Sequence, residues 1–363
     1  MDAPEPETLP ELPQFPRDFP DRAFKELMTD LRNLKDLTEV VAPDYAHCLD
    51  CLNAAIVPNE IIVSEVPDSP KGISDIIYEV PVREHEGTIF PMSVKVVEHQ
   101  SKPEADVIFR GYWVLSSRWQ QRKQDWERGR NPGPFFLTPG TGVIVYTGSH
   151  SWNGPRTISQ LIRGPQELIK ESPQWAPRFL EVRQHSPEQL LNMDQRLFQS
   201  LAVVRGQHEP AGIFGAIFTD AFQALTSLRR EDRGRWIGLA RFMLSWGLAK
   251  RSPAEHEGLR RLARKVYRGR QAQQEIQEMM DTIIGAEFMK GVQQGETRGR
   301  LAARREDLTS LLSKKFAANM DESFVQRIEA AENPDILRQW FEEALSAKSW
   351  KQFIKAANWP PSS

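Results

Sequence analysis

The stretch Val94-Lys95-Val96-Val97-Glu98-His99-Gln100 has the composition of a buried β-strand that ends in polar residues. Successive side chains of a strand point to opposite faces of its sheet, so Glu98 and Gln100 share one face. Lys95 and His99 point to the other face. An acid and an amide that point the same way at the end of a strand form a candidate functional site.

A second acidic residue, Asp75, lies upstream in Ser74-Asp75-Ile76-Ile77-Tyr78. If Asp75 begins the paired strand of a hairpin, its carboxylate approaches that of Glu98, and two clustered carboxylates repel unless a cation lies between them. Mg²⁺ suits this position because it prefers oxygen ligands and is commonly held by one or two carboxylates plus substrate phosphate oxygens. The pair therefore indicates a metal-dependent nuclease site, in which the ion acidifies water and neutralises charge on a phosphodiester.

These two motifs belong to a longer ordered series. The series comprises Asp21-Arg22-Ala23-Phe24-Lys25-Glu26-Leu27, Ser74-Asp75-Ile76-Ile77-Tyr78, Val97-Glu98-His99-Gln100-Ser101, Tyr146-Thr147-Gly148 and Trp152. In this order it resembles the recombination-promoting nuclease family, also labelled putative transposase, YhgA-like, of the PD-(D/E)XK nuclease superfamily. The resemblance covers roughly residues 21–165, and the Glu-His-Gln-Ser motif is its most specific part.

The resemblance implies an α/β fold with a restriction-endonuclease-like core, in which helices flank a mixed central sheet, followed by an α-helical C-terminal half. It also implies that Asp75 and Glu98 are metal ligands. Together with Gln100 they would form the catalytic residues of a Mg²⁺-dependent DNA endonuclease that acts by direct attack of water.

Gln100 stands where the superfamily more often has lysine. A lysine supplies a positive charge, whereas an amide can orient water or phosphate only through neutral hydrogen bonds. Lys95 cannot take this role because it falls on the opposite face of the strand. Its presence in a run that the family tends to keep apolar is a further departure.

Other functions fit the same residues. A catalytically degenerate protein with the nuclease fold would bind nucleic acid or act as a regulatory or interaction module. The transposase label suggests strand transfer, but the sequence offers no convincing third carboxylate for that chemistry. Glu26, on the first expected helix, is interpreted as a solvated surface residue.

The apolar pattern predicts a helix that begins near Asp21, with one face formed by Phe24, Leu27, Met28, Leu31 and Leu34. Strands are expected at residues 61–66, 75–82 and 89–99, a second helix around residues 108–119, and a strand at residues 143–146 after a loop at residues 139–142. The order of helix, three strands, helix and strand is that of the nuclease core that the chain resembles.

The chain is expected to contain several regions. They are a disordered acidic, proline-rich tail at residues 1–20, a nuclease-like domain at 21–165, a helical extension at 166–285, a glycine-punctuated helical linker at 286–305 and a small helical C-terminal module at 306–357. Self-association or partner binding is the expected role of the C-terminal module, which makes a homo-oligomer possible.

A net charge of −2 and a pI near 6.4 argue against a globally basic nucleic-acid binder. Residues 229–270, however, hold 13 Lys or Arg against four Asp or Glu. Arg260, Arg261, Arg264, Lys265 and Arg268 recur at three- and four-residue steps and would share one helix face. This face and Arg110 are candidates for contact with DNA phosphates, and a solvated helix face is the alternative.

Cys48 and Cys51 form a Cys-x-x-Cys pair without a second pair to complete a zinc site, so buried thiols are expected. Two cysteines in 363 residues favour a reducing compartment. The acidic, proline-rich N-terminus is unlike a secretory signal, and the uncharged run at residues 210–219 is too short to span a bilayer. We therefore expect a cytoplasmic protein that does not enter a membrane.

Overall fold

The structure is a computed structural model that describes residues 19–57, 76–83, 93–130, 133–267, 269–319, 322–331 and 333–357, without the side chains of residues 286–300, 318, 322 and 323. Asp75, Arg268, the expected strand at residues 61–66, residues 89–92 of the strand expected at 89–99 and residues 1–18 of the tail expected at 1–20 lie outside the described residues. The last two residues of that tail, Phe19 and Pro20, are buried and begin the first helix, so the expectation is wrong for them. The chain divides between Ile283 and Ile284 into two compact units, and each is described by itself.

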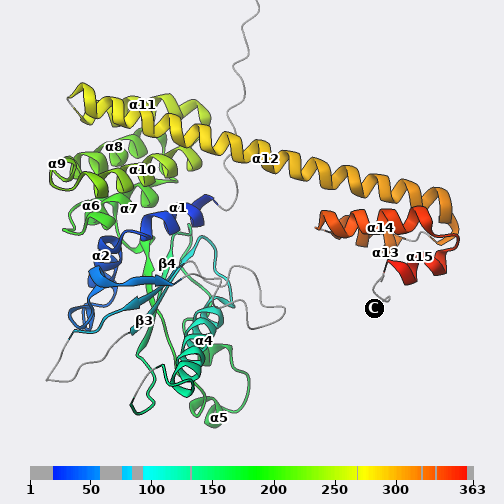
Figure 1. Ribbon diagram of the computed structural model, residues 1–363. Helices are drawn as coiled ribbons and strands as arrows, with labels where there is room; N and C mark the ends of the chain where they lie inside the picture. The colour runs from blue at the N-terminus through cyan, green and yellow to red at the C-terminus, as the bar shows by residue number, and fades with distance from the viewer. Residues whose placement is uncertain are drawn as a thin grey trace, which may run out of the picture. The chain divides into compact units, whose positions relative to one another are not determined.

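One mixed sheet organises the larger unit (Figure 1). Its strands, in spatial order, are β1 (Ala55–Val57), β2 (Ile76–Val80), β3 (Ser93–Gln100), β4 (Gly140–Tyr146) and β5 (Arg178–Glu181). The pairs β1–β2 and β2–β3 are antiparallel, whereas β3–β4 and β4–β5 are parallel. The expected mixed sheet is confirmed, and it gains β5 from the segment that was expected to be mainly helical.

The central strand β3 is buried along its whole length. It pairs with β2 from Ile76 opposite Val97, and with β4 up to Gln100 opposite Tyr146. Such burial requires cover on both faces of the sheet, which explains the nearly continuous apolar run in the sequence.

Helix α4 (Val107–Glu127) covers the face of the sheet that carries Glu98 and Gln100. Val114 and Leu115 of α4 pack against Val94 and Val96 of β3. The expected second helix is therefore confirmed. The expected loop at residues 139–142 is wrong from Gly140 onward, because β4 begins there. A β-carbon on Gly140 would lie 2.1 Å from Leu115. Glycine at this position lets the helix approach the strand.

The opposite face is covered by α1 (Phe19–Met28) and α2 (Leu31–Val41). The single apolar stripe expected from the sequence is divided between these two helices, because the Asp30 side chain accepts the Arg32 N–H and begins a second helix there. The Tyr78 hydroxyl donates to the Met28 carbonyl at 2.6 Å and so joins α1 to β2.

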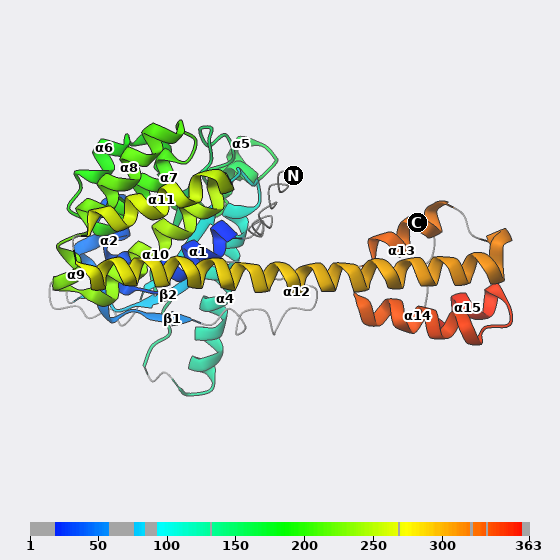
Figure 2. The ribbon, with the colours of Figure 1, turned by 90° about the horizontal axis from the view of Figure 1, so that it is seen from above.

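The rest of the larger unit is mainly helical. Its helices are η1 (Ala46–Cys48), η2 (Cys51–Asn53), η3 (Ile158–Leu161), α5 (Gln166–Lys170), η4 (Val182–Gln184), α6 (Pro187–Leu191), α7 (Arg196–Gly206), α8 (Ala211–Ala224), α9 (Leu228–Glu231), α10 (Arg233–Lys250), α11 (Pro253–Val266) and the start of α12 (Arg270–Phe316). Helices α7, α8, α10 and α11 lie together in both views (Figures 1 and 2). Asp36 of α2 accepts from the Leu197 N–H at 2.9 Å and from Arg235 at 2.6 Å, which joins this helical layer to the sheet.

Residues 211–231 are long and apolar enough to cross a membrane by length and composition alone. In the structure they form two helices, α8 and α9, and not one. Phe214, Phe218 and Phe222 of α8 are fully buried in the protein core. The segment therefore packs as the core helix of a folded domain does.

The smaller unit comprises the later part of α12 with η5 (Ala317–Asn319), α13 (Glu322–Ala330), α14 (Pro334–Ser346) and α15 (Trp350–Ala356). Leu308, Leu312, Ile328, Leu337 and Phe353 form its buried core. The Asn333 side chain accepts the Asp335 N–H at 2.9 Å, so Asn333 is the N-cap of α14 before Pro334. The residues expected to form a linker lie within α12.

Lys95 is an unusual member of the sheet core. Its side chain lies on the α2 side, as the alternation predicts, and it is fully buried. The ammonium donates to Thr38 Oγ1 at 2.8 Å, and no carboxylate among the described residues pairs with it. Burial lowers the pKa of Lys95 from 10.5 to about 8.

We predict that Lys95→Met raises the free energy of unfolding at pH 7 by about 2 kcal/mol, because it removes a desolvated charge and keeps the side-chain volume. The native lysine, with its pKa of about 8, loses its proton before the unfolded one at 10.5. Stability of the wild type therefore rises between these pH values, and the difference between the proteins shrinks. Urea unfolding at pH 7, 9 and 10 measures both effects.

Lys35→Met is the matched control, because Lys35 lies exposed on α2 beside Glu39 and its removal should change stability by less than about 0.5 kcal/mol. A Lys95→Met protein that is less stable than the wild type at pH 7 would contradict the prediction.

Candidate active site

Glu98 and Gln100 lie at the carboxyl end of β3, on the face that α4 covers. Both are buried, and the exposed fraction of Glu98 is only 4%. They point the same way because they are two residues apart in an extended strand. A buried carboxylate is stable only beside compensating charge or hydrogen-bond donors, so its surroundings define the chemistry of this edge.

Arg110, on the first turn of α4, brings a positive charge to this edge. Its Nη2 lies 3.8 Å from Glu98 Oε2, and its Nη1 donates to Glu104 at 3.0 Å and to Asp106 at 2.9 Å. Burial acts to lower the pKa of Arg110, but the charge of Glu98 and the hydrogen bonds to Glu104 and Asp106 raise it above its ordinary value. The guanidinium is therefore a fixed cation beside the predicted catalytic acid.

Asp75 lies outside the described residues. The residue that follows it, Ile76, begins β2 and pairs with Val97, next to Glu98. Within the part of the chain that the structure describes, no group of three or more His, Cys, Asp or Glu side chains could hold a metal ion.

His99 joins three of the motifs noted in the sequence. Its Nδ1 lies 2.6 Å from Asp21 Oδ1 on α1, and its Nε2 lies 2.9 Å from Thr147 Oγ1 after β4. Because a carboxylate can only accept, Nδ1 donates to Asp21, and Nε2 forms the second hydrogen bond, to the Thr147 hydroxyl. The ring also stacks on Phe24 with centroids 5.1 Å apart. Sequence reasoning missed this role, although all three polar residues lie within the quoted motifs.

Tyr146, Gly148 and Trp152 shape the wall beside this edge. The Tyr146 and Trp152 rings meet edge to face with centroids 5.2 Å apart. A β-carbon on Gly148 would lie 2.2 Å from the Tyr146 hydroxyl, so glycine is required by the close approach of the ring. Glu181 accepts the Trp152 backbone N–H at 3.0 Å. These contacts give the three motif residues a structural role beside the candidate site.

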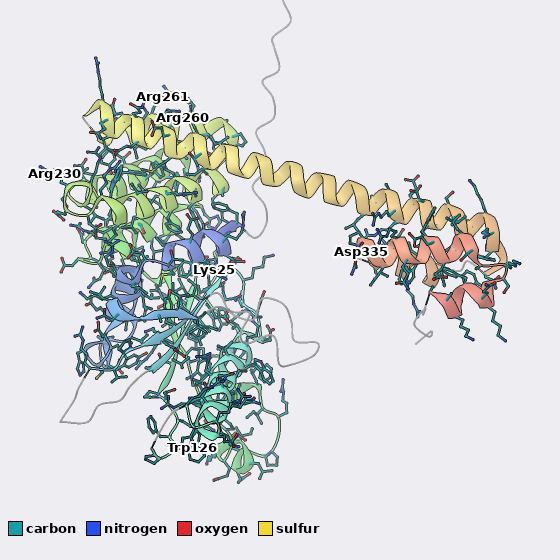
Figure 3. All side chains as sticks on the ribbon, viewed as in Figure 1. Lys25, Trp126, Arg230, Arg260, Arg261 and Asp335 are labelled. Carbon is teal, nitrogen blue, oxygen red and sulfur yellow. The ribbon has the colours of Figure 1, made fainter. Side chains whose placement is uncertain are left out.

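Much of the positive charge of residues 229–270 is neutralised within the fold. Arg229 and Arg233 both contact Glu275, and Arg235 contacts Asp36. Further ion pairs join Arg241 to Glu26, Arg251 to Glu255, and Arg260 to Glu257 and Asp281. Arg261, Arg264 and Lys265 remain exposed on α11, where Figure 3 shows Arg260 and Arg261, and Arg268 lies outside the described residues. The expected basic face is thus smaller than the sequence suggests.

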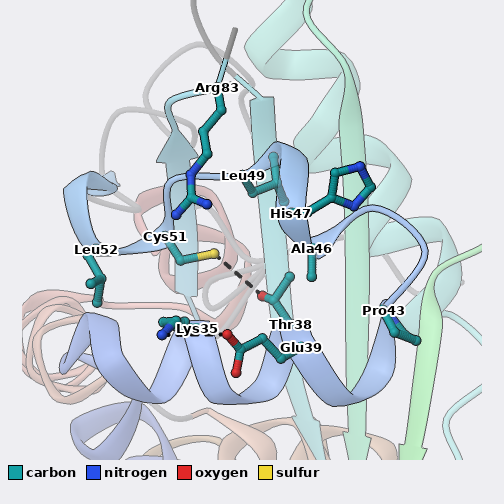
Figure 4. A pocket seen from close by; sticks show the side chains of 10 residues that line it. All are labelled: Lys35, Thr38, Glu39, Pro43, Ala46, His47, Leu49, Cys51, Leu52 and Arg83. Carbon is teal, nitrogen blue, oxygen red and sulfur yellow. Dashed lines mark hydrogen bonds and ion pairs between the residues drawn. The ribbon is translucent and has the colours of Figure 1, made fainter. Parts of the chain in front are cut away.

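Cys51 lines a different cavity, of about 370 Å³, beside α2 (Figure 4), whereas Cys48 is not among its lining residues. Both thiols are free, and Cys51 is buried 3.7 Å from Thr38 Oγ1. Burial raises the pKa of the Cys51 thiol. Cys48 is only partly buried and lies 3.3 Å from His47 Nε2, so the expectation of buried thiols holds for one of the two.

The sheet, its helical cover and the polar edge define an α/β protein whose candidate site lies where the parallel strands end. A family profile described as "Putative transposase, YhgA-like" matches residues 19–211, which is more than half of the chain. The chain belongs to this family. No curated protein and no solved structure matches the chain.

We predict that His99→Ala lowers the free energy of unfolding by about 2–4 kcal/mol. The substitution removes a packed ring and leaves the Thr147 hydroxyl without its imidazole partner in the core. Urea unfolding followed by tryptophan fluorescence measures the loss. His150→Ala is the control, because His150 is exposed and contacts its neighbour Ser149. A His99→Ala protein as stable as the His150→Ala protein would refute the proposed role.

Proposed function

We propose that this protein is a Mg²⁺-dependent DNA endonuclease with a PD-(D/E)XK core. The observation that carries the proposal is the buried Glu98 carboxylate, which shares a face with Gln100 at the end of the central strand and has the Arg110 cation beside it. Family membership and the order of helix, antiparallel strands, helix and parallel strand support it. Glu98 and Asp75 would hold the metal.

The described donors fit Mg²⁺ in kind. A carboxylate oxygen and an amide oxygen are hard ligands, and Mg²⁺ keeps several waters and takes phosphate oxygens, so one or two protein carboxylates suffice. Bound there, the ion would acidify water and neutralise charge on the phosphodiester.

The protein's own side chains would complete the site. The Gln100 amide would orient the attacking water or a phosphate oxygen by neutral hydrogen bonds. The Arg110 guanidinium would donate to a non-bridging phosphate oxygen and supply the positive charge that Gln100 lacks. Burial of Glu98 strengthens these electrostatic interactions because little water screens them.

One observation favours a second function. Arg110 already neutralises Glu98 and also contacts Glu104 and Asp106, which is an arrangement that needs no metal. A catalytically degenerate protein of the same fold would use this edge to bind nucleic acid without cutting it. DNA is the proposed partner in either case.

We predict that Glu98→Gln lowers Mg²⁺-dependent nicking of supercoiled plasmid at least about 100-fold, because it removes a ligand charge while keeping the side-chain shape. Asp75→Asn should have the same effect. Glu104→Gln is the matched control, since Glu104 contacts the same arginine but its side chain is half exposed, and it should keep activity within a few-fold.

The plasmid assay is run with Mg²⁺ and with chelator, beside isothermal titration of Mg²⁺. Metal-dependent cutting by the wild type and the Glu104→Gln protein alone supports the nuclease. Equal inactivity of all folded proteins would favour the binding function. Equal cutting by all of them would rule out Glu98 as the catalytic acid.

We predict that Arg110→Gln weakens DNA binding and reduces the salt dependence of log Kd by about one unit, as expected for loss of one phosphate contact. Fluorescence anisotropy with a labelled duplex in chelator, at several salt concentrations, measures both quantities. Arg128→Gln, at the exposed far end of α4, is the control. Identical salt slopes for Arg110→Gln and the wild type would contradict the assignment.

A further inference from the structure

A basic cavity opens at the carboxyl end of the parallel strands, apart from the Glu98 site. It has a volume of about 230 Å³ and is formed by the chain after β4, the chain after β5 and the end of α7. Its polar lining comprises Thr147, Ser149, Arg183, Arg205, Gln207 and His208, and its lining contains no Asp or Glu. This edge of parallel strands is where open α/β sheets commonly bind ligands.

The charge of the cavity is positive and only partly compensated. Arg205 lies 3.5 Å from Glu209 and donates to the His185 carbonyl at 3.2 Å. Arg183 donates to Ser151 Oγ at 3.4 Å, and none of the described carboxylates forms an ion pair with it. A cavity with an uncompensated guanidinium and no lining acid attracts an anion.

The cavity also presents fixed hydrogen-bonding groups. His99 holds the Thr147 hydroxyl at 2.9 Å, and Gln207 Nε2 donates to the Thr147 carbonyl at 3.3 Å. Gln207 itself accepts from Trp246 Nε1 at 3.2 Å, so buried contacts fix this wall. Against this wall, the planar guanidinium of Arg183 supplies several N–H donors that match the oxygens of a phosphate group.

The cavity adjoins the proposed cleavage site through the backbone. The Thr147 N–H donates to the Gln100 carbonyl at 2.9 Å, although Thr147 faces α1 and α10 whereas Gln100 faces α4. Neighbouring strands lie about 4.8 Å apart and nucleotides rise about 3.4 Å along a DNA strand. A DNA strand that crosses this edge of the sheet would therefore reach the cavity within a few nucleotides.

We infer that the cavity binds a phosphate group of the DNA strand, a few nucleotides from the bond that the proposed nuclease cleaves. The inference rests on the proposed function for the identity of the ligand. The cavity itself is defined by Arg183, Arg205, His208 and Thr147.

Binding of a labelled duplex by full-length protein in chelator tests this inference without any cleavage. Arg183→Gln should weaken binding about 5- to 20-fold and reduce the salt slope of log Kd by about one unit. Arg163→Gln, which changes an exposed arginine outside the cavity, should leave both unchanged. Equal affinities and slopes for Arg183→Gln and the wild type would overturn the inference.

Titration with inorganic phosphate provides a second measurement. In protein labelled with ¹³C-histidine, phosphate should shift the His208 resonance of the wild type and not that of Arg183→Gln. If phosphate shifts His208 while Arg183→Gln binds DNA normally, the cavity binds free phosphate and its assignment to DNA is wrong.

The inference and the proposed function fail in different ways. If cleavage depends on Glu98 but the wild type and Arg183→Gln bind DNA with equal affinity, the phosphate-binding role of the cavity is wrong and the nuclease function stands. If the wild type binds DNA through Arg183 but never cuts it, the phosphate-binding role of the cavity stands and the nuclease function is wrong.

Discussion

The hydrogen bonds of His99 constrain the arrangement of the sheet edge. A single buried ring joins Asp21 of α1 to the end of β3 and to Thr147 after β4. Because Nδ1 must donate to the carboxylate, the ring orientation is fixed, and so is the position of the Thr147 hydroxyl. Glu98 and Gln100 flank His99 in the same strand, so their direction toward α4 follows from its direction toward α1.

This constraint separates two kinds of polar chemistry on the two faces of one strand. On the α4 face, Glu98 lies beside Arg110, where negative and positive charges meet. On the α1 face, His99 forms a hydrogen bond with Thr147, and Thr147 lines a cavity together with Arg183 and Arg205. The proposed substrate, a nucleic-acid strand with several negative charges in a row, would contact both faces across the edge.

The sequence predicts the central strand and the long helix beside it well, and it predicts the short edge strands of the sheet poorly. The nearly continuous apolar run of β3 and the helical spacing in α4 are strong local patterns, and both elements are confirmed over their described residues. Strands β1 and β5, with three and four residues, are too short to show a period. The sequence also groups Glu98 with Gln100 correctly. It cannot reveal the contacts of His99, because Asp21 and Thr147 are distant from His99 in the chain. For the same reason it cannot reveal the ion pairs that neutralise much of the positive charge of residues 229–270.

The carboxylate of Asp36 shows that the family-matched segment is not self-sufficient. Asp36 lies within residues 19–211, yet its cation, Arg235, comes from α10, beyond that segment. Trp246 of the same helix meets His99 edge to face with centroids 6.1 Å apart. Removal of everything after residue 211 would leave a buried acid without its counter-ion and one side of the His99 ring uncovered. The compact unit that contains the family-matched segment accordingly continues well beyond residue 211, to Ile283.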